Sequence, residues 1–132
     1  MPKQLSDPKA QQAVTEPEPT ERESRLREVS PGRLALEGAL TLNTVPTLAR
    51  QGARLLKALQ SKAGNEPIRV EIDLSGIDRS SSAGIALLLD WVDQASRDGI
   101  SLHFQHWPEA LVRIAIFSNV EGLLGIEAAQ HG

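Results

Sequence analysis

Residues 72–89 read IDLSGIDRSSSAGIALLL, and the hydrophobic pattern changes character within this stretch. From Ile68 to Leu74 apolar and polar residues alternate, which is the two-residue period of a half-buried strand. A polar segment ending in three serines, Ser80–Ser82, comes next, and the residues after it are mostly apolar. The stretch therefore predicts a strand, a polar loop and the start of a helix.

The sequence after this stretch predicts a second helix, a strand and a third helix. The second helix covers about residues 83–97 and ends at Asp98 and Gly99, where glycine can adopt the left-handed stop conformation. Alternation of Ile100, Leu102 and Phe104 with polar residues predicts the strand. The third helix covers about residues 108–118, and residues 123–126 are predicted to form a small edge strand or a helical turn.

The sequence before this stretch predicts a hairpin and a first helix. Two short strand candidates, residues 25–29 and 33–37, are joined by the turn-forming triplet at residues 30–32. An amphipathic helix is predicted over about residues 44–60, with Pro46 in its first turn. The resulting order is β-β-α-β-α-β-α, so we expect an α/β fold with a mixed β-sheet that opens with a hairpin and has helices packed against it.

Chain length and composition indicate one globular domain with an N-terminal tail. The chain has 132 residues, and its 40% hydrophobic and 23% charged residues are typical of globular proteins. Residues 1–24 are rich in proline and polar residues and offer little apolar area to offset the entropy of ordering. We expect a flexible tail over residues 1–24, as a plain extension or a partner-binding arm, and a folded domain over residues 25–132.

Composition also excludes several functional classes. The net charge of -3 and an aromatic content of 3% disfavour nucleic-acid binding, and the absence of cysteine excludes thiolate chemistry and disulfides. The longest apolar run, residues 85–89, is far shorter than the roughly 20 residues that span a bilayer, and residues 1–10 lack the apolar core of a signal peptide. We expect a cytoplasmic protein without direct membrane insertion.

No catalytic, metal or cofactor site is expected from the polar residues. The three histidines, His103, His106 and His131, show no metal-ligand spacing. The aspartates Asp73, Asp78 and Asp90 are accompanied by neither a nucleophile nor a phosphate-binding glycine loop. The sequence therefore favours a non-enzymatic role with no cofactor.

The segment at residues 72–89 resembles the signature of STAS domains, the fold of anti-sigma-factor antagonists. In that family a strand ending in D-L-S or similar is followed by D-S-S-G or D-T-G-G and then an apolar helix. The resemblance covers about residues 25–125. It is closest to the MlaB-type subunit of the phospholipid-transporting Mla ABC complex, given the segments at residues 72–75 and 86–89 and the later Ile114, Ala115 and Asn119.

This resemblance implies a cytoplasmic accessory subunit that binds the ATPase of an ABC transporter and, through it, a membrane permease. Aligning Gly84 with the motif glycine places Ser81 at the usual Asp, Ser82 at the first hydroxyl position and Ala83 at the second. The second hydroxyl is the kinase target in regulatory STAS proteins, and Ala83 has none. Ser82 is the remaining candidate for phosphorylation, and an anti-sigma-factor antagonist regulated by a Ser/Thr kinase is the alternative function.

The helical wheel of residues 83–97 supplies candidate partner-binding residues. It places Ile85, Leu88, Leu89, Val92 and Ala95 on a core-facing arc, with Trp91 at its border. The opposite face, next to the serines, is predicted to dock a partner, although a single exposed leucine is also common on ordinary surfaces. The partner-binding residues expected on this helix and its loop are Ser81, Ser82, Ala83, Ala86, Leu87 and Asp90.

The third helix is apolar almost all round, so one-sided packing does not account for all its apolar residues. If Leu111, Ile114 and Ala115 face the sheet, Val112 and Ile116 lie nearer solvent and add to the partner-binding set. The alternative is deeper burial under residues 119–126. Both arrangements agree with the sequence.

Overall fold

The described part of the protein, residues 24–126 of a computed structural model, forms one sheet with helices on one face and at one end. The elements follow the predicted β-β-α-β-α-β-α order, which is therefore confirmed. Only Ser24 of the expected tail lies within the described residues, so the tail stays a prediction. The elements are β1 (Arg25–Ser30), β2 (Arg33–Ala39), α2 (Val45–Ala63), β3 (Ile68–Arg79), α3 (Ser82–Arg97), β4 (Ile100–Gln105) and α4 (Glu109–Phe117).

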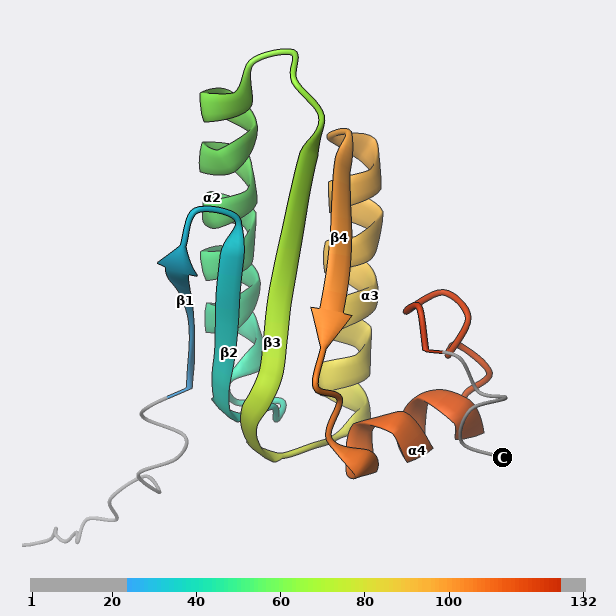
Figure 1. The fold of residues 1–132 in the computed structure, drawn as a ribbon. Coiled ribbons are helices and arrows are strands. Elements are labelled where there is room, and N and C mark those ends of the chain that lie inside the picture. The colour runs from blue at the N-terminus through green and yellow to red at the C-terminus, as the bar shows by residue number, and fades with distance from the viewer. Residues whose placement is uncertain (1–23, 127–132) are drawn as a thin grey trace, which may run out of the picture.

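The sheet is mixed and has the strand order β1-β2-β3-β4. β1 and β2 form an antiparallel hairpin, whereas β2, β3 and β4 are parallel. Figure 1 shows α2 and α3 side by side behind the sheet and α4 at the end where the three parallel strands finish. The carboxyl ends of β2, β3 and β4 thus meet at one end of the domain, where open α/β sheets commonly bind ligands.

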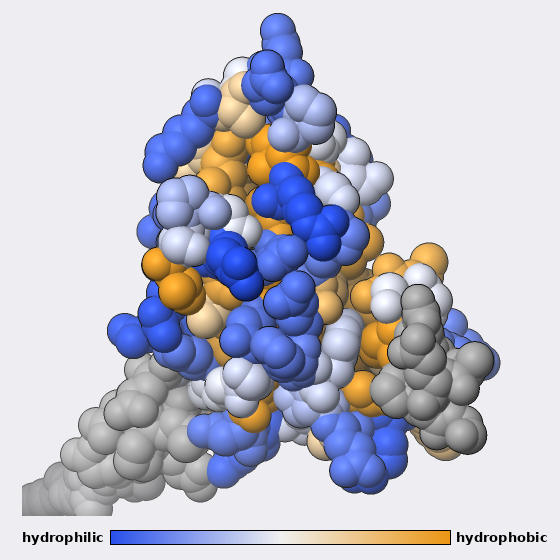
Figure 2. All heavy atoms as spheres, in the orientation of Figure 1, coloured by the Kyte–Doolittle hydropathy of each residue, from blue (hydrophilic) through white to orange (hydrophobic). Residues whose placement is uncertain are grey.

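The two faces of the sheet differ because alternate side chains point in opposite directions. Leu34, Leu36, Val70 and Ile72 point toward the helices and are at most 2% exposed. The opposite face is open and polar, and Figure 2 shows hydrophilic residues over much of it. Ion pairs of exposed arginines with Glu37 and Glu71 lie on this face, and such surface pairs contribute little each.

Two carboxylates on the open face have shifted pKa values. The hydrogen bond from Arg27 holds the pKa of Glu37 below its ordinary value, with a smaller contribution from Arg25. The backbone N–H of Ser75 lowers the pKa of Asp73, and His106, 3.1 Å from its Oδ1, adds to this. Each carboxylate therefore stabilises the fold at pH values above the pKa that it has in the unfolded chain. This contribution is lost as the pH falls through the lower pKa of the folded state.

β3 is longer than the sequence pattern indicates. The strand was expected to end at Leu74, but it continues to Arg79 through a segment predicted to be a polar loop. The second half of β2 pairs with this segment after register shifts, placing Glu37 opposite Gly76 and Gly38 opposite Ile77. These irregularities break the alternation along the chain while the backbone hydrogen bonding continues.

The C-terminal piece forms hydrogen-bonded turns and no strand. The N–H of Leu124 donates to the carbonyl of Val120 at 3.2 Å, and that of Ile126 donates to Glu121 at 2.9 Å. Leu124 and Ile126 are buried, at 4% and 6% exposure. The helical-turn alternative of the sequence is the better description.

A glycine in the middle of α2 determines how closely α2 and α3 approach. A Cβ atom on Gly52 would lie 2.3 Å from Nε1 and 2.4 Å from Cε2 of Trp91. Trp91 is 1% exposed and is the largest fully buried side chain of the described residues. The indole therefore fills the space that any other residue at position 52 would need.

We expect Gly52→Ala to destabilise the domain by about 1–3 kcal/mol, since overpacking of a rigid ring outweighs the gain in helix propensity. Thermal melts of the two proteins check this. Trp91→Phe removes the indole nitrogen, so the double variant should lose less than the sum of the single variants. A Gly52→Ala protein that is more stable than the parent would contradict the described contact.

Candidate functional site

The serine loop at the start of α3 is fixed by a cap. Ser81 has extended backbone, and its Oγ accepts a hydrogen bond from the N–H of Gly84 at 3.4 Å. The same hydroxyl donates to the carbonyl of Leu40 at 2.7 Å. Ser81 thus caps α3 and joins the β3–α3 loop to the loop after β2, which leaves the exposed Ser82 as the first helical residue.

Gly84 allows the helix start to lie against the loop after β2. A Cβ atom at this position would come within 2.8 Å of both Cβ and Cδ1 of Leu40, a side chain that is fully buried. The glycine of the motif is therefore accounted for by packing. Ala83, next to it, is partly buried and presents only a methyl group.

The prediction that Leu87 is exposed is wrong, because its side chain is only 3% exposed. The stripe of Gly84, Leu87 and Trp91 runs at helical spacing along the side of α3 that meets α2 and the loop after β2. The wheel assumed that the sheet alone covers α3, but α2 covers a second side. Leu89 and Val92, expected in the core, are only partly buried as a consequence.

Val112 is only 7% exposed, so the arrangement in which it lies nearer solvent is wrong, and the alternative of deeper burial describes this residue. Leu111, Val112 and Ala115 form the buried side of α4, which contacts α3. Ile116 is exposed as expected, at 36%. Ser82, Ala86 and Asp90 are exposed on α3, as the wheel places them, and their role in binding stays a prediction.

Two strongly exposed apolar residues at this end of the domain were not among the predicted site residues. Leu42, in the loop after β2, is 82% exposed, and Phe117, the last residue of α4, is 92% exposed. The apolar surround of α4 hinted at Phe117, but nothing in the local sequence distinguishes Leu42 from a core leucine. We call the exposed residues at this end the carboxyl-end surface, defined as Leu42, Ser82, Ala86, Ile116 and Phe117.

The carboxyl-end surface has the chemistry of a protein-binding surface. A large apolar side chain held exposed on a folded helix offers area that a partner can remove from water. Figure 1 shows the β3–α3 loop and α4 at the same end of the sheet, and Figure 2 shows hydrophobic residues on the flank formed by α4 and the following turns. An ion pair on α4, between a guanidinium nitrogen of Arg113 and Oε2 of Glu109 at 3.1 Å, adds charge to the same helix.

The described residues do not group into a metal site, and no helix among them is long and apolar enough to cross a membrane. Nδ1 of His106 contacts Oδ1 of a single carboxylate, that of Asp73, on the open face of the sheet. Nε2 of His103 lies 3.0 Å from a guanidinium nitrogen of Arg69 and 2.8 Å from the hydroxyl oxygen of Ser101. These contacts are ordinary surface interactions. The residue types at the carboxyl-end surface suit contact with another protein better than acid–base chemistry.

Comparison with known proteins agrees with the fold. A family model described as "Mlab, STAS domain" matches residues 25–125, which is most of the chain. A search of curated proteins gave no match. One solved structure, titled "Crystal Structure Analysis of Mglu", is 16% identical with a TM-score of 0.46, and the match covers 64% of this chain and 19% of that one. On the family match, the chain belongs to the STAS domain family of MlaB type.

Proposed function

We propose that the protein is a cytoplasmic accessory subunit that binds and supports the ATPase of a phospholipid-transporting ABC complex. The observation that carries this proposal is that an MlaB-type STAS domain exposes Leu42, in the loop after β2, and Phe117, on α4, at the end of the sheet where the serine loop lies. STAS domains are generally non-catalytic, and we propose no enzymatic activity for this one. Its position at the inner membrane would come from the ATPase and, through the ATPase, from the permease.

The serine loop supports docking because hydrogen bonds and packing within the domain already hold it in one conformation. Ser81 is bonded at both its acceptor and donor positions, and Gly84 packs against Leu40. A surface that is already ordered loses little conformational entropy on binding. The exposed side chains of Ser82 and Ala86 are then presented on a helix start that these contacts hold in place.

Ala83 supports the transporter role over kinase control. A phosphoryl group needs a hydroxyl oxygen, and the residue at the second position of the motif is an alanine. One observation favours the alternative, an anti-sigma-factor antagonist: Ser82 is exposed at a helix start, where a phosphate is electrostatically favoured. Incubation of the full chain with a Ser/Thr kinase, followed by mass spectrometry, separates the two roles at this residue.

The proposal is tested by ATPase assays with the purified full chain. The chain alone should hydrolyse no ATP. Added to the ABC ATPase of its own organism, it should form a stable complex in size-exclusion chromatography and change the hydrolysis rate. Separate elution at micromolar concentrations, with an unchanged rate, would contradict the proposal.

Ser82→Asp should weaken ATPase binding while leaving the fold intact. A carboxylate in the first turn suits the helix dipole, so the free energy of unfolding should stay within about 0.5 kcal/mol of the parent value. At the docking surface the same charge would have to be desolvated against a partner, which predicts a loss of roughly tenfold in affinity. Ser101→Asp, on the open face of the sheet, is the matched control and should bind as the parent does. Equal affinities for both variants would exclude Ser82 from the contact.

A further inference from the structure

Helix α2 is basic although the chain as a whole is acidic. It contains Arg50, Arg54, Lys57 and Lys62 and neither aspartate nor glutamate, in a chain of net charge -3. Arg50, Arg54 and Lys57 are exposed. This separation of charge creates a local positive field on one side of the domain.

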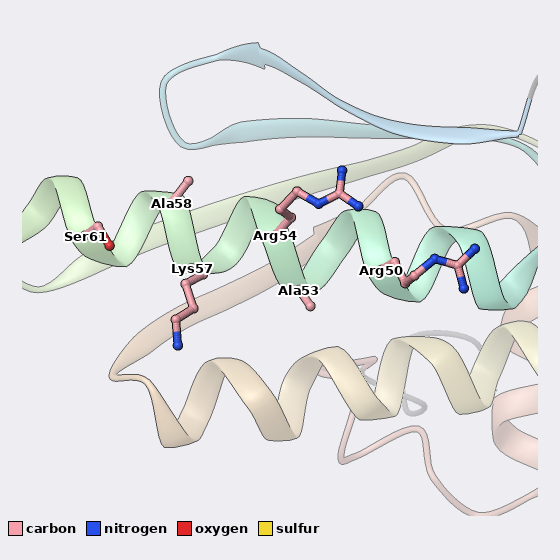
Figure 3. A pocket seen from close by; sticks show the side chains of 6 residues that line it. All are labelled: Arg50, Ala53, Arg54, Lys57, Ala58 and Ser61. Atoms are coloured by element: carbon pink, nitrogen blue, oxygen red, sulfur yellow. The ribbon is translucent and has the colours of Figure 1, made fainter.

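The basic residues line an open groove on the outer side of α2. Its volume is about 580 Å³, and Figure 3 shows Arg50, Arg54 and Lys57 spaced along the helix, with Ala53 between Arg50 and Arg54 and with Ala58 after Lys57. Arg54 also lines a second groove, between α2 and β1, together with Leu26 and other residues. The two grooves therefore continue from α2 to the strand that begins the described chain.

The cations of this groove lack acidic partners within residues 24–126. The only hydrogen bond of Arg50 there is a long one, 3.4 Å, to the hydroxyl of Thr47. Neither Arg54 nor Lys57 forms an ion pair with a carboxylate of the described residues, whereas Arg97 on α3 pairs with Asp93 at 2.9 Å. An anionic segment could therefore pair with these cations without displacing a carboxylate of the described residues.

The chain itself contains a segment of complementary charge. Residues 16–23 read EPEPTERE, with four glutamates and one arginine. A residue before proline favours extended or polyproline conformation, in which Glu16 and Glu18 would be about 6.2 Å apart. The rise along a helix from Arg50 to Arg54 is about 6 Å, so the two spacings match.

The segment can reach the groove. The backbone N–H of Leu26 donates to Oε1 of Gln51 at 2.8 Å, which places the start of β1 beside the basic part of α2. Glu18 precedes Leu26 by eight residues, a reach of up to about 27 Å when extended. A tether this short gives an effective concentration in the millimolar range.

From these observations we infer that the acidic segment at residues 16–23 binds the basic groove of α2 in the same chain, with Glu16 and Glu18 next to Arg50 and Arg54. This binding would shield the groove from other anions. It is independent of the ATPase contact, because α2 takes no part in the carboxyl-end surface.

Paramagnetic relaxation enhancement tests this inference on the full chain. The protein has no cysteine, so Thr15→Cys carries one nitroxide label without further changes. We expect amide signals around Arg50–Lys57 to broaden, and the broadening to disappear in about 1 M salt, where the Debye length is about 3 Å. The double variant Arg50→Glu and Arg54→Glu should show no such broadening. Adding Glu16→Arg and Glu18→Arg to this variant should restore the broadening, because the charges are then complementary again.

Lys62→Glu, in the last turn of the same helix, is the control and should leave the broadening unchanged. Broadening confined to residues near Ser24, or unaffected by reversal at Arg50 and Arg54, would overturn the inference. Sedimentation with phosphatidylglycerol vesicles adds a second arm. Binding that needs Arg50 and Arg54 but is indifferent to the charge of Glu16 and Glu18 would assign the groove to an anionic lipid surface and also overturn it.

Discussion

Leu87→Asp should abolish stable folding of the domain. Leu87 is 3% exposed between Gly84 and Trp91 on the side of α3 that faces α2. Loss of a buried leucine side chain costs about 3–5 kcal/mol, and an unpaired carboxylate in its place adds several more. Since total stabilities are typically about 5–15 kcal/mol, circular dichroism and thermal melts should show a largely unfolded protein at 25 °C.

Ala86→Asp is the matched control for Leu87→Asp. It introduces the same charge one residue earlier, at an exposed position, and should change stability by only about 0.5 kcal/mol. A folded Leu87→Asp protein with a parental melting temperature would mean that the described phase of α3 is wrong. The docking face would then be the one derived from the wheel.

Phe117→Asp should weaken ATPase binding more than any other single change at the carboxyl-end surface. The side chain is 92% exposed in the free domain, so its replacement leaves folding almost unchanged. A buried aromatic anchor at an interface contributes about 2–4 kcal/mol, which corresponds to a loss of roughly 30- to 1000-fold in affinity. Titration calorimetry with the purified ATPase measures this loss directly.

Val29→Asp is the control for Phe117→Asp. Val29 is also an exposed apolar residue, at 57%, but it lies in β1 next to the hairpin turn, away from α4 (Figure 1). Its affinity for the ATPase should equal that of the parent. If Phe117→Asp binds the ATPase as well as Val29→Asp does, the ATPase contact lies elsewhere on the domain.

The local hydrophobic pattern was enough to predict the element order, because the periods of two residues for strands and 3.6 residues for helices can be recognised within a short stretch of sequence. The alternation from Ile68 to Leu74 and the leucines of α2 identified their elements well. The second half of β3 was missed because its pairing with β2 is non-local and irregular in register. Backbone hydrogen bonding to another strand leaves no hydrophobic period at Ser75–Gly76.

The candidate site was predicted less completely than the fold, for a similar reason. The serine loop and its cap follow from local residue types, and Ser81 takes the capping role. The phase of α3 depends on the contact of Trp91 with Gly52, two residues far apart in the sequence. The wheel could not contain this contact, so Leu87 was assigned to the wrong face. The apolar character of α4 pointed to Phe117, whereas Leu42 could be identified only from its exposure in the structure.

Affinity capture measures docking to an ABC ATPase through the carboxyl-end surface. The tagged full chain and its Phe117→Asp variant would be incubated in parallel with native lysate, and the captured proteins identified by mass spectrometry. We expect the parent to capture an ABC ATPase with its permease and the variant to capture much less. Capture of only a Ser/Thr kinase or sigma-factor regulator, or equal capture of the ATPase by both proteins, would contradict this expectation.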